Sequence, residues 1–250
     1  MHKSILISAV VVILLAGALI AARMQSLPRQ IISLTESDYA ETATHAYTPS
    51  PSAKPAASPT PTLAPLPKAI ALSVPFLVQA PHANWDALHE DACEEASLIM
   101  VKHYLEGTSI DLDAGDQEIQ NLIQTETAAD YGASVTAEEL ATIATMVGLK
   151  GTVAPLATAD DLKRQLAAGR PVILPLAGQQ LSQPHFTPPG PVYHMLVVTG
   201  YDADGFITND PGVSQGKGYR YSFQNLIDSA HDWDAQDINA GAKVYLTVSR

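Results

Sequence analysis

The stretch Asp91-Ala92-Cys93-Glu94-Glu95-Ala96-Ser97-Leu98-Ile99-Met100 carries the pattern that most strongly indicates the fold. Asp91 is followed three residues later by Glu94, which is the spacing of a capping box, and small or apolar residues then recur at helical intervals. Gly107 supplies a natural stop for the same helix. The pattern therefore predicts a helix over residues 92–106 with Cys93 in its first turn.

The chain around this helix holds further helical and strand patterns in an uneven order. Apolar residues at helical spacing predict helices over residues 117–126, 137–147, 159–168 and 223–229. Apolar or alternating runs predict strands over residues 70–76, 151–156, 171–176, 193–201, 205–208, 219–222 and 243–248. Because helices dominate the first half and strands the second, this order favours an α+β fold with a helical side packed on a mainly antiparallel sheet.

Composition and charge exclude several classes of function. The chain has 250 residues and a formal net charge of -12, and it contains no cluster of Lys and Arg that could neutralise a row of phosphates. Nucleic-acid binding is therefore not expected. The single Cys excludes an internal disulfide and a Cys-rich zinc site. A metal site built on His82 and His89 is not expected either, because these residues lack a known ligand spacing.

The N-terminal part of the chain differs in composition from the rest. Residues 5–22 carry no charge and reach the lower length limit for a bilayer-spanning helix, so residues 1–32 are interpreted as a membrane anchor or a cleaved secretory signal. Residues 33–68 are rich in Pro, Ser, Thr and Ala, which predicts a linker with polyproline II bias. The folded domain is then expected over residues 69–250, anchored outside the cytoplasm or secreted.

Cys93 has both a structural and a functional interpretation. A lone Cys is often a small buried hydrophobe. At a helix start, however, unpaired backbone N–H groups and the helix dipole stabilise a thiolate, as a nucleophile requires. The neighbouring Asp91, Glu94 and Glu95 oppose ionisation, so a protonated His would be needed nearby.

The partners of such a nucleophile can be sought in the strand region. His194 opens the apolar run of residues 194–200, which would hold an imidazole on a rigid strand. The next short strand ends in Asn209 and Asp210, and a hairpin would place either side chain near His194 to orient the ring. Upstream, Gln79 ends another strand-like run, and its amide beside the Cys93 N–H would form an oxyanion hole.

Five segments in this order resemble one known family. They are Val74-Pro75-Phe76-Leu77-Val78-Gln79-Ala80-Pro81, Asn84-Trp85, Ala92-Cys93-Glu94-Glu95-Ala96-Ser97, Tyr193-His194-Met195-Leu196-Val197-Val198 and Asn209-Asp210-Pro211-Gly212. Together they resemble the bacteriocin-leader-processing type of papain-like cysteine peptidase, and more closely its stand-alone relatives, the C-thirty-nine-like domains. The resemblance covers residues 70–250 and implies the papain-like fold.

The resemblance implies roles for four residues: Cys93, His194 and Asp210 as the catalytic triad, and Gln79 as part of the oxyanion hole. Exporter-linked members of the family carry Asp-Cys-Gly at the nucleophile, whereas this chain has Ala92-Cys93-Glu94. No ATP-binding cassette follows the domain, so processing coupled to export is not expected.

Residues and resemblance together predict a cysteine peptidase that hydrolyses amide bonds of a peptide or protein outside the cytoplasm, through a thioester and without metal or cofactor. One alternative is a peptide-binding module of the same fold with little turnover. Another is a wall-modifying acyl transferase that passes the acyl group to an amine. The sequence leaves open the cleavage specificity, the oligomeric state, the choice between Asp210 and Asn209, and whether the N-terminal segment is cleaved.

Overall fold

The computed structural model describes residues 64–250. The predicted anchor or signal segment and nearly all of the predicted linker lie outside the described residues. Within the described part, no helix is both long and apolar enough to cross a membrane.

Five helices of the described part form close to where the periodicity predicts them. They are α2 (Cys93–Glu106), α3 (Leu112–Ala128), α4 (Ala137–Met146), α5 (Ala159–Ala167) and α6 (Phe223–Ser229). The largest difference concerns α3, which begins five residues before the predicted residue 117. The Asp111 side chain accepts hydrogen bonds from the N–H groups of Asp113 and Ala114 and so caps the longer helix.

Seven antiparallel strands form one sheet, in the order β2-β7-β3-β4-β5-β6 with β1 paired to β4. They are β1 (Ile70–Ala71), β2 (Lys150–Pro155), β3 (Val172–Ala177), β4 (Tyr193–Tyr201), β5 (Phe206–Asn209), β6 (Lys217–Tyr221) and β7 (Val244–Ser249). The α+β fold with a mainly antiparallel sheet is therefore confirmed.

The prediction of a strand over residues 70–76 is wrong beyond its first residues. β1 pairs only with Gly200 and Tyr201 at the end of β4. From Val198 backwards, the same edge of β4 is occupied by β3, which leaves no partner for a longer β1. The chain after Ala71 therefore continues without regular pairing and leads to Gln79 and the site.

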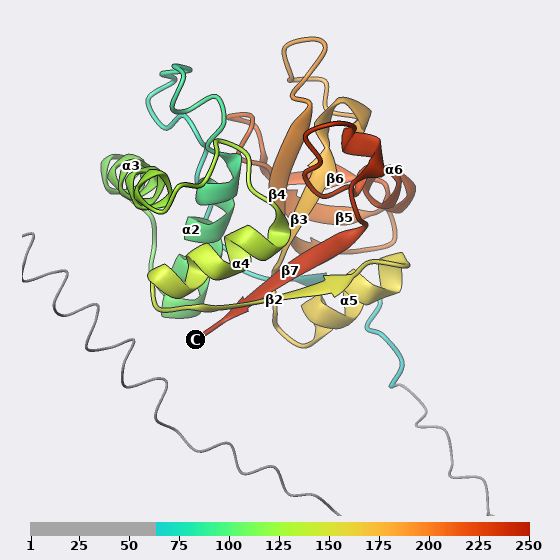
Figure 1. Cartoon of the computed structure of the whole chain (residues 1–250). Helices are drawn as coiled ribbons and strands as arrows, with labels where there is room; N and C mark the ends of the chain where they lie inside the picture. The colour runs from blue at the N-terminus through green and yellow to red at the C-terminus, as the bar shows by residue number, and fades with distance from the viewer. Residues whose placement is uncertain (1–63) are drawn as a thin grey trace, which may run out of the picture. The chain divides into compact units, whose positions relative to one another are not determined.

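The sheet has an apolar core on each face. Helices lie on either side of the sheet (Figure 1). Alternate residues of β4 serve the two cores: Met195 and Val197 pack with α2, whereas Leu196 and Val198 pack with residues of α5 and α6. Burial on both faces explains why β4 reads as one continuous apolar run. The rigid strand fixes the position of the His194 Cα beside the start of α2.

Candidate active site

Cys93 is the first residue of α2, and its side chain reaches a cavity of about 560 Å³. The residue is only 5% exposed. The cavity is also lined by Gln79, His194 and the segment after β5, and by His185 and Phe186 from the loop that precedes β4. Segments distant in sequence therefore meet at this one opening, and the loop forms one wall of it.

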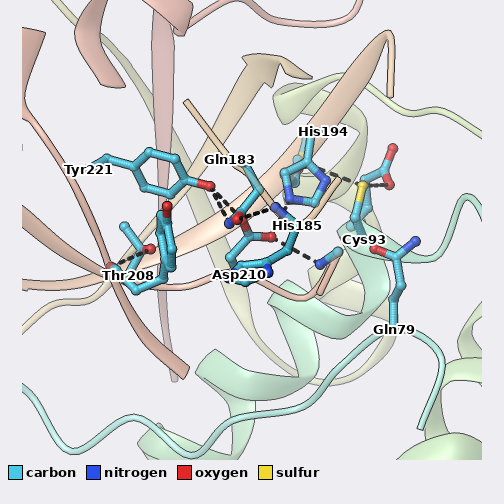
Figure 2. Close-up of polar contacts among 12 residues, drawn as sticks. Gln79, Cys93, Gln183, His185, His194, Thr208, Asp210 and Tyr221 are labelled. Carbon is cyan, nitrogen blue, oxygen red and sulfur yellow. Dashed lines mark hydrogen bonds and ion pairs between the residues drawn. The ribbon is translucent and has the colours of Figure 1, made fainter. Parts of the chain in front are cut away.

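His194 and Asp210 are joined by a short hydrogen bond. The start of β4 lies beside the end of β5 because the two strands are antiparallel. This places His194 Nε2 2.7 Å from Asp210 Oδ1, with the Asp210 carboxylate fully buried. Figure 2 shows the imidazole between the Asp210 carboxylate and the Cys93 sulfur. Since Nε2 is engaged by Asp210, Nδ1 is the nitrogen left to exchange a proton with the thiol.

Asn209, the alternative to Asp210, takes a different role. Its side-chain amide donates to the carbonyl oxygens of Val74 and Pro75, at 3.1 and 3.3 Å, and its oxygen accepts from the Gly218 N–H. Asn209 thus ties the chain before Gln79 to the sheet, while Asp210 contacts the ring.

Two residues that sequence reasoning missed hold the Asp210 carboxylate. Its Oδ2 accepts from the Tyr221 hydroxyl at 2.6 Å and from Gln183 Nε2 at 3.0 Å, while the Gly212 N–H donates to Oδ1. Burial alone would raise the pKa of Asp210, but the charge of His194 and these hydrogen bonds lower it below its usual value. Asp210 is therefore held ionised beneath the ring. The one signal for Tyr221 was its place on the strand predicted over residues 219–222, which follows Asp210 in the sequence.

The Cys93 sulfur has two polar contacts. The Met195 N–H points to Sγ at 3.3 Å, and Sγ–H donates to Glu94 Oε2 at 2.8 Å. Within residues 64–250 no hydrogen bond joins Sγ to the His194 ring. Burial, followed by the charge of Glu94, raises the pKa of the thiol. In this arrangement the thiol keeps its proton and donates it in a hydrogen bond to Glu94.

The predicted capping box of Asp91 and Glu94 is wrong. The N-cap of α2 is Ala92, and no side chain caps the helix. Glu94 instead turns inward, is 1% exposed, and accepts a hydrogen bond from the Val135 N–H through Oε1. Burial raises the pKa of Glu94 to about 8. The Glu94 carboxyl therefore bonds to the thiol and to the Val135 N–H instead of to the N–H groups at the start of the helix.

Gln79 lies at the cavity beside Cys93 (Figure 2), but its amide N–H groups are engaged. Nε2 donates to the carbonyl oxygens of His89 and Glu90, at 2.8 and 2.9 Å. Oε1 is buried and has no partner among the described residues. As the structure stands, the amide presents no free donor to an oxyanion.

The described residues contain no cluster of three or more His, Cys, Asp or Glu side chains that could hold a metal ion. His82 contacts Asp113, and His89 lies between Asp86 and Asp116. These histidines thus contact nearby Asp side chains.

Comparison with known proteins places this geometry in a family. The sequence model of the Peptidase_C39 like family matches residues 71–238. A crystal structure of a candidate C39-like peptidase from Bacillus anthracis is similar in fold, at 17% sequence identity and a TM-score of 0.50; the match covers 74% of this chain and 99% of that chain. No curated protein matches the chain. Because the family match spans well over half of the chain, the protein belongs to the Peptidase_C39 like family, a family of papain-like cysteine peptidases.

Proposed function

We propose that the protein hydrolyses peptide bonds with Cys93 as nucleophile, His194 as general acid and base, and Asp210 as the group that orients the ring. The observation that carries this proposal is the His194–Asp210 hydrogen bond of 2.7 Å, next to a sulfur that accepts from the adjacent Met195 N–H. A nucleophile, a base and a buried orienting carboxylate are the parts that covalent amide hydrolysis needs.

The reaction begins when the Cys93 thiol proton moves to His194 Nδ1 and the thiolate attacks the substrate carbonyl carbon. His194 then protonates the leaving amine, and a thioester remains on Sγ. Water, deprotonated by His194, attacks the thioester, releases the acid and restores the thiol. Asp210 stabilises the imidazolium through Nε2–H in both halves of the reaction.

The negative oxygen of each tetrahedral intermediate needs hydrogen-bond donors. The Cys93 backbone N–H is one, because it lies at the first residue of α2 and has no partner within the helix. Gln79 is the second, provided that one of its N–H groups leaves the carbonyl of His89 or Glu90 when substrate binds. Its place in the cavity wall supports this role.

Incubation of the purified protein with a peptide library tests this function. Wild type is expected to release peptide fragments, seen by mass spectrometry, and Cys93→Ala to release none while keeping the wild-type circular dichroism spectrum. Equal products from both proteins would assign the cleavage to another centre.

Two other functions use the same site. The thiol bonded to Glu94 favours a peptide-binding module with little turnover, which would retain the peptides uncleaved. An acyl transferase would join the acyl group to an added amine, and mass spectrometry of the products separates this outcome from hydrolysis.

The location outside the cytoplasm stays part of the proposal and rests on the apolar residues 5–22. Protease protection of the full-length protein in intact cells tests it.

A further inference from the structure

Three buried carboxyl groups lie behind the nucleophile: Glu94 and Glu95 on α2 and Glu126 on α3. Their residues are 1%, 3% and 4% exposed. Among the described residues, no Lys, Arg or His forms an ion pair with any of the three. Every ion pair there involves another Asp or Glu. An isolated ionised carboxylate is costly to bury, so this arrangement favours protonated carboxyls.

Glu94 uses its two oxygens differently. Oε1 accepts from the Val135 N–H at 3.3 Å, so this oxygen is oriented as an acceptor. Oε2 faces the Cys93 sulfur at 2.8 Å, a distance at which either atom can carry the proton between them. An ionised Glu94 can only accept from the thiol. A protonated Glu94 can donate to a thiolate.

We propose that Glu94 gates the nucleophile: its protonated form donates an Oε2–H hydrogen bond to the Cys93 thiolate, and its ionised form keeps the thiol proton on the sulfur. This inference deepens the proposed function, on which its catalytic meaning rests. It assigns to Glu94 a role in the reactivity of the thiol that is separate from those of His194 and Asp210.

The proton balance follows from the contacts. In the reactive state the thiol proton passes to His194 Nδ1, His194 Nε2–H is bonded to Asp210, and Glu94 keeps its own proton. When Glu94 loses that proton to solvent, the thiol retains its hydrogen and donates it to Oε2, as the structure has it. Burial raises the pKa of Glu94 to about 8, while burial and the charge of Glu94 raise that of the thiol further. A single shared proton therefore stays on the sulfur.

Other buried acidic groups surround Glu94 and oppose its ionisation. On α2 and α3, Glu95 and Glu126 are neighbouring buried carboxyl groups, and burial raises the pKa of each. On β4, the Tyr193 hydroxyl lies 3.0 Å from the Val135 carbonyl oxygen and 3.3 Å from Asp232 Oδ1, and burial raises the pKa of both Tyr193 and Asp232.

Further acids and one base complete these surroundings. Glu90 and Asp91 line the cavity, as does His185. His194 is the base proposed to become cationic next to the sulfur. Burial and the neighbouring acids oppose a negative charge on Glu94, whereas that imidazolium and the hydrogen bonds from the Val135 N–H and the thiol favour it; burial is the largest of these effects.

Alkylation of Cys93 by iodoacetamide tests the gate without any substrate. Cys93 is the only Cys of the chain, so the rate constant reports one thiol. In wild type we expect the rate constant to fall as pH rises through about 8, and to be about tenfold below its plateau one pH unit higher, where roughly a tenth of Glu94 remains protonated.

Glu94→Gln should abolish this alkaline fall, because its carboxamide oxygen can accept from the Val135 N–H and its NH₂ can donate to Sγ, as a permanently protonated Glu94 would. Glu95→Gln is the matched control. It removes a neighbouring buried carboxyl that forms no hydrogen bond to the Cys93 sulfur, so the fall should persist.

A wild-type rate constant that does not fall above pH 8, or the same fall retained in Glu94→Gln, would overturn the gate. If Glu94→Gln does not fold, the ultraviolet absorbance of the wild-type thiolate, measured against Cys93→Ser, decides: it must decrease across this pH range, and an increase rejects the proposal. Failure of peptide cleavage with the gate intact would count against the proposed function alone.

Discussion

At the scale of single residues, the Asp210 carboxylate depends on donors that lie far from it in sequence. Of the two hydrogen bonds that Asp210 Oδ2 accepts, the one from the Tyr221 hydroxyl is the shorter, at 2.6 Å. The Tyr221 ring is buried, so Tyr221→Phe would leave a buried charge one donor short without changing the packing much. Such a loss costs about 1–3 kcal/mol.

We therefore expect Tyr221→Phe to lower the free energy of unfolding by this amount and to reduce peptide cleavage several-fold, measured by urea denaturation and by kcat/KM. The control is Tyr219→Phe. Tyr219 lies on the same strand, its ring packs against that of Tyr221, and its hydroxyl donates a longer hydrogen bond of 3.3 Å to the Ser182 carbonyl oxygen. Equal effects of the two substitutions would contradict a specific role of Tyr221.

Cys93 and His194 could be named as candidates from the sequence because each stands at the end of a periodic element, whereas the residues alone left open the choice between Asn209 and Asp210. Gln183, Tyr221 and the inward turn of Glu94 could not be predicted, because they depend on long-range contacts. Gln183 lies in an irregular loop and Tyr221 two strands away from His194. Glu94 matched a local capping pattern, and the buried thiol and the Val135 N–H outcompeted the local interaction.

At the scale of elements, the site depends on the close approach of three segments around the His194 ring. The loop before β4 brings Phe186 edge-on to the imidazole, with ring centroids 5.4 Å apart. The turn after β5 brings Gly212 against the same ring. A Cβ at Gly212 would lie 2.9 Å from His194 Cε1 and 2.9 Å from Phe186 Cε1, too close for either ring to stay in place.

Gly212→Ala should therefore displace the imidazole and reduce kcat by roughly tenfold to a hundredfold, since small misplacements of a reacting group have effects of this size. The thermal midpoint should also fall, because the displaced ring weakens its hydrogen bond to the buried Asp210 carboxylate. Gly132→Ala, where the nearest atom is 3.7 Å from the added Cβ, should leave both quantities unchanged. Wild-type kcat in Gly212→Ala would contradict the described position of the ring.

Element types were predictable where the periodicity was long, and less so where an end depends on a neighbour. β4 and α6 have the predicted bounds. β1 is shorter than its apolar pattern because β3 already occupies the edge of β4. α3 is longer because its start depends on the Asp111 cap rather than on apolar spacing.

At the scale of the whole molecule, the buried carboxyls make stability depend on pH. The pKa of Glu94 is raised by burial from 4.5 to about 8, so between these values the folded state keeps a proton that the unfolded state has lost. Stability from this group is fully present below pH 4.5 and falls as pH rises through 8. Asp210, whose pKa is lowered, acts oppositely: its contribution is present at neutral pH and is lost on acidification.

We expect the free energy of unfolding in urea to decrease by on the order of a few kcal/mol between about pH 5 and about pH 8. Glu94→Gln should make this decrease smaller because it has no proton to lose, while Glu95 and Glu126 keep their contributions. A wild-type stability that rises across this interval would contradict the placement of unpaired carboxyls in the core.

The α+β class and the family could be inferred from the order of elements and motifs along the whole chain. The two-sided burial of the sheet could not, because the pattern of helices first and strands later suggests one helical side. α5 and α6 cover the second face, and their contacts with β3 and β4 appear only in three dimensions.

The central claim is that Cys93 and His194 act as one reacting unit. The measurement that tests it most directly is kcat/KM for one cleaved peptide with wild type, Cys93→Ala, His194→Ala and the double variant. Groups that act together lose activity non-additively. We predict that all three variants fall by on the order of a thousandfold or more and to the same level. A His194→Ala protein that cleaves as fast as wild type would contradict the account.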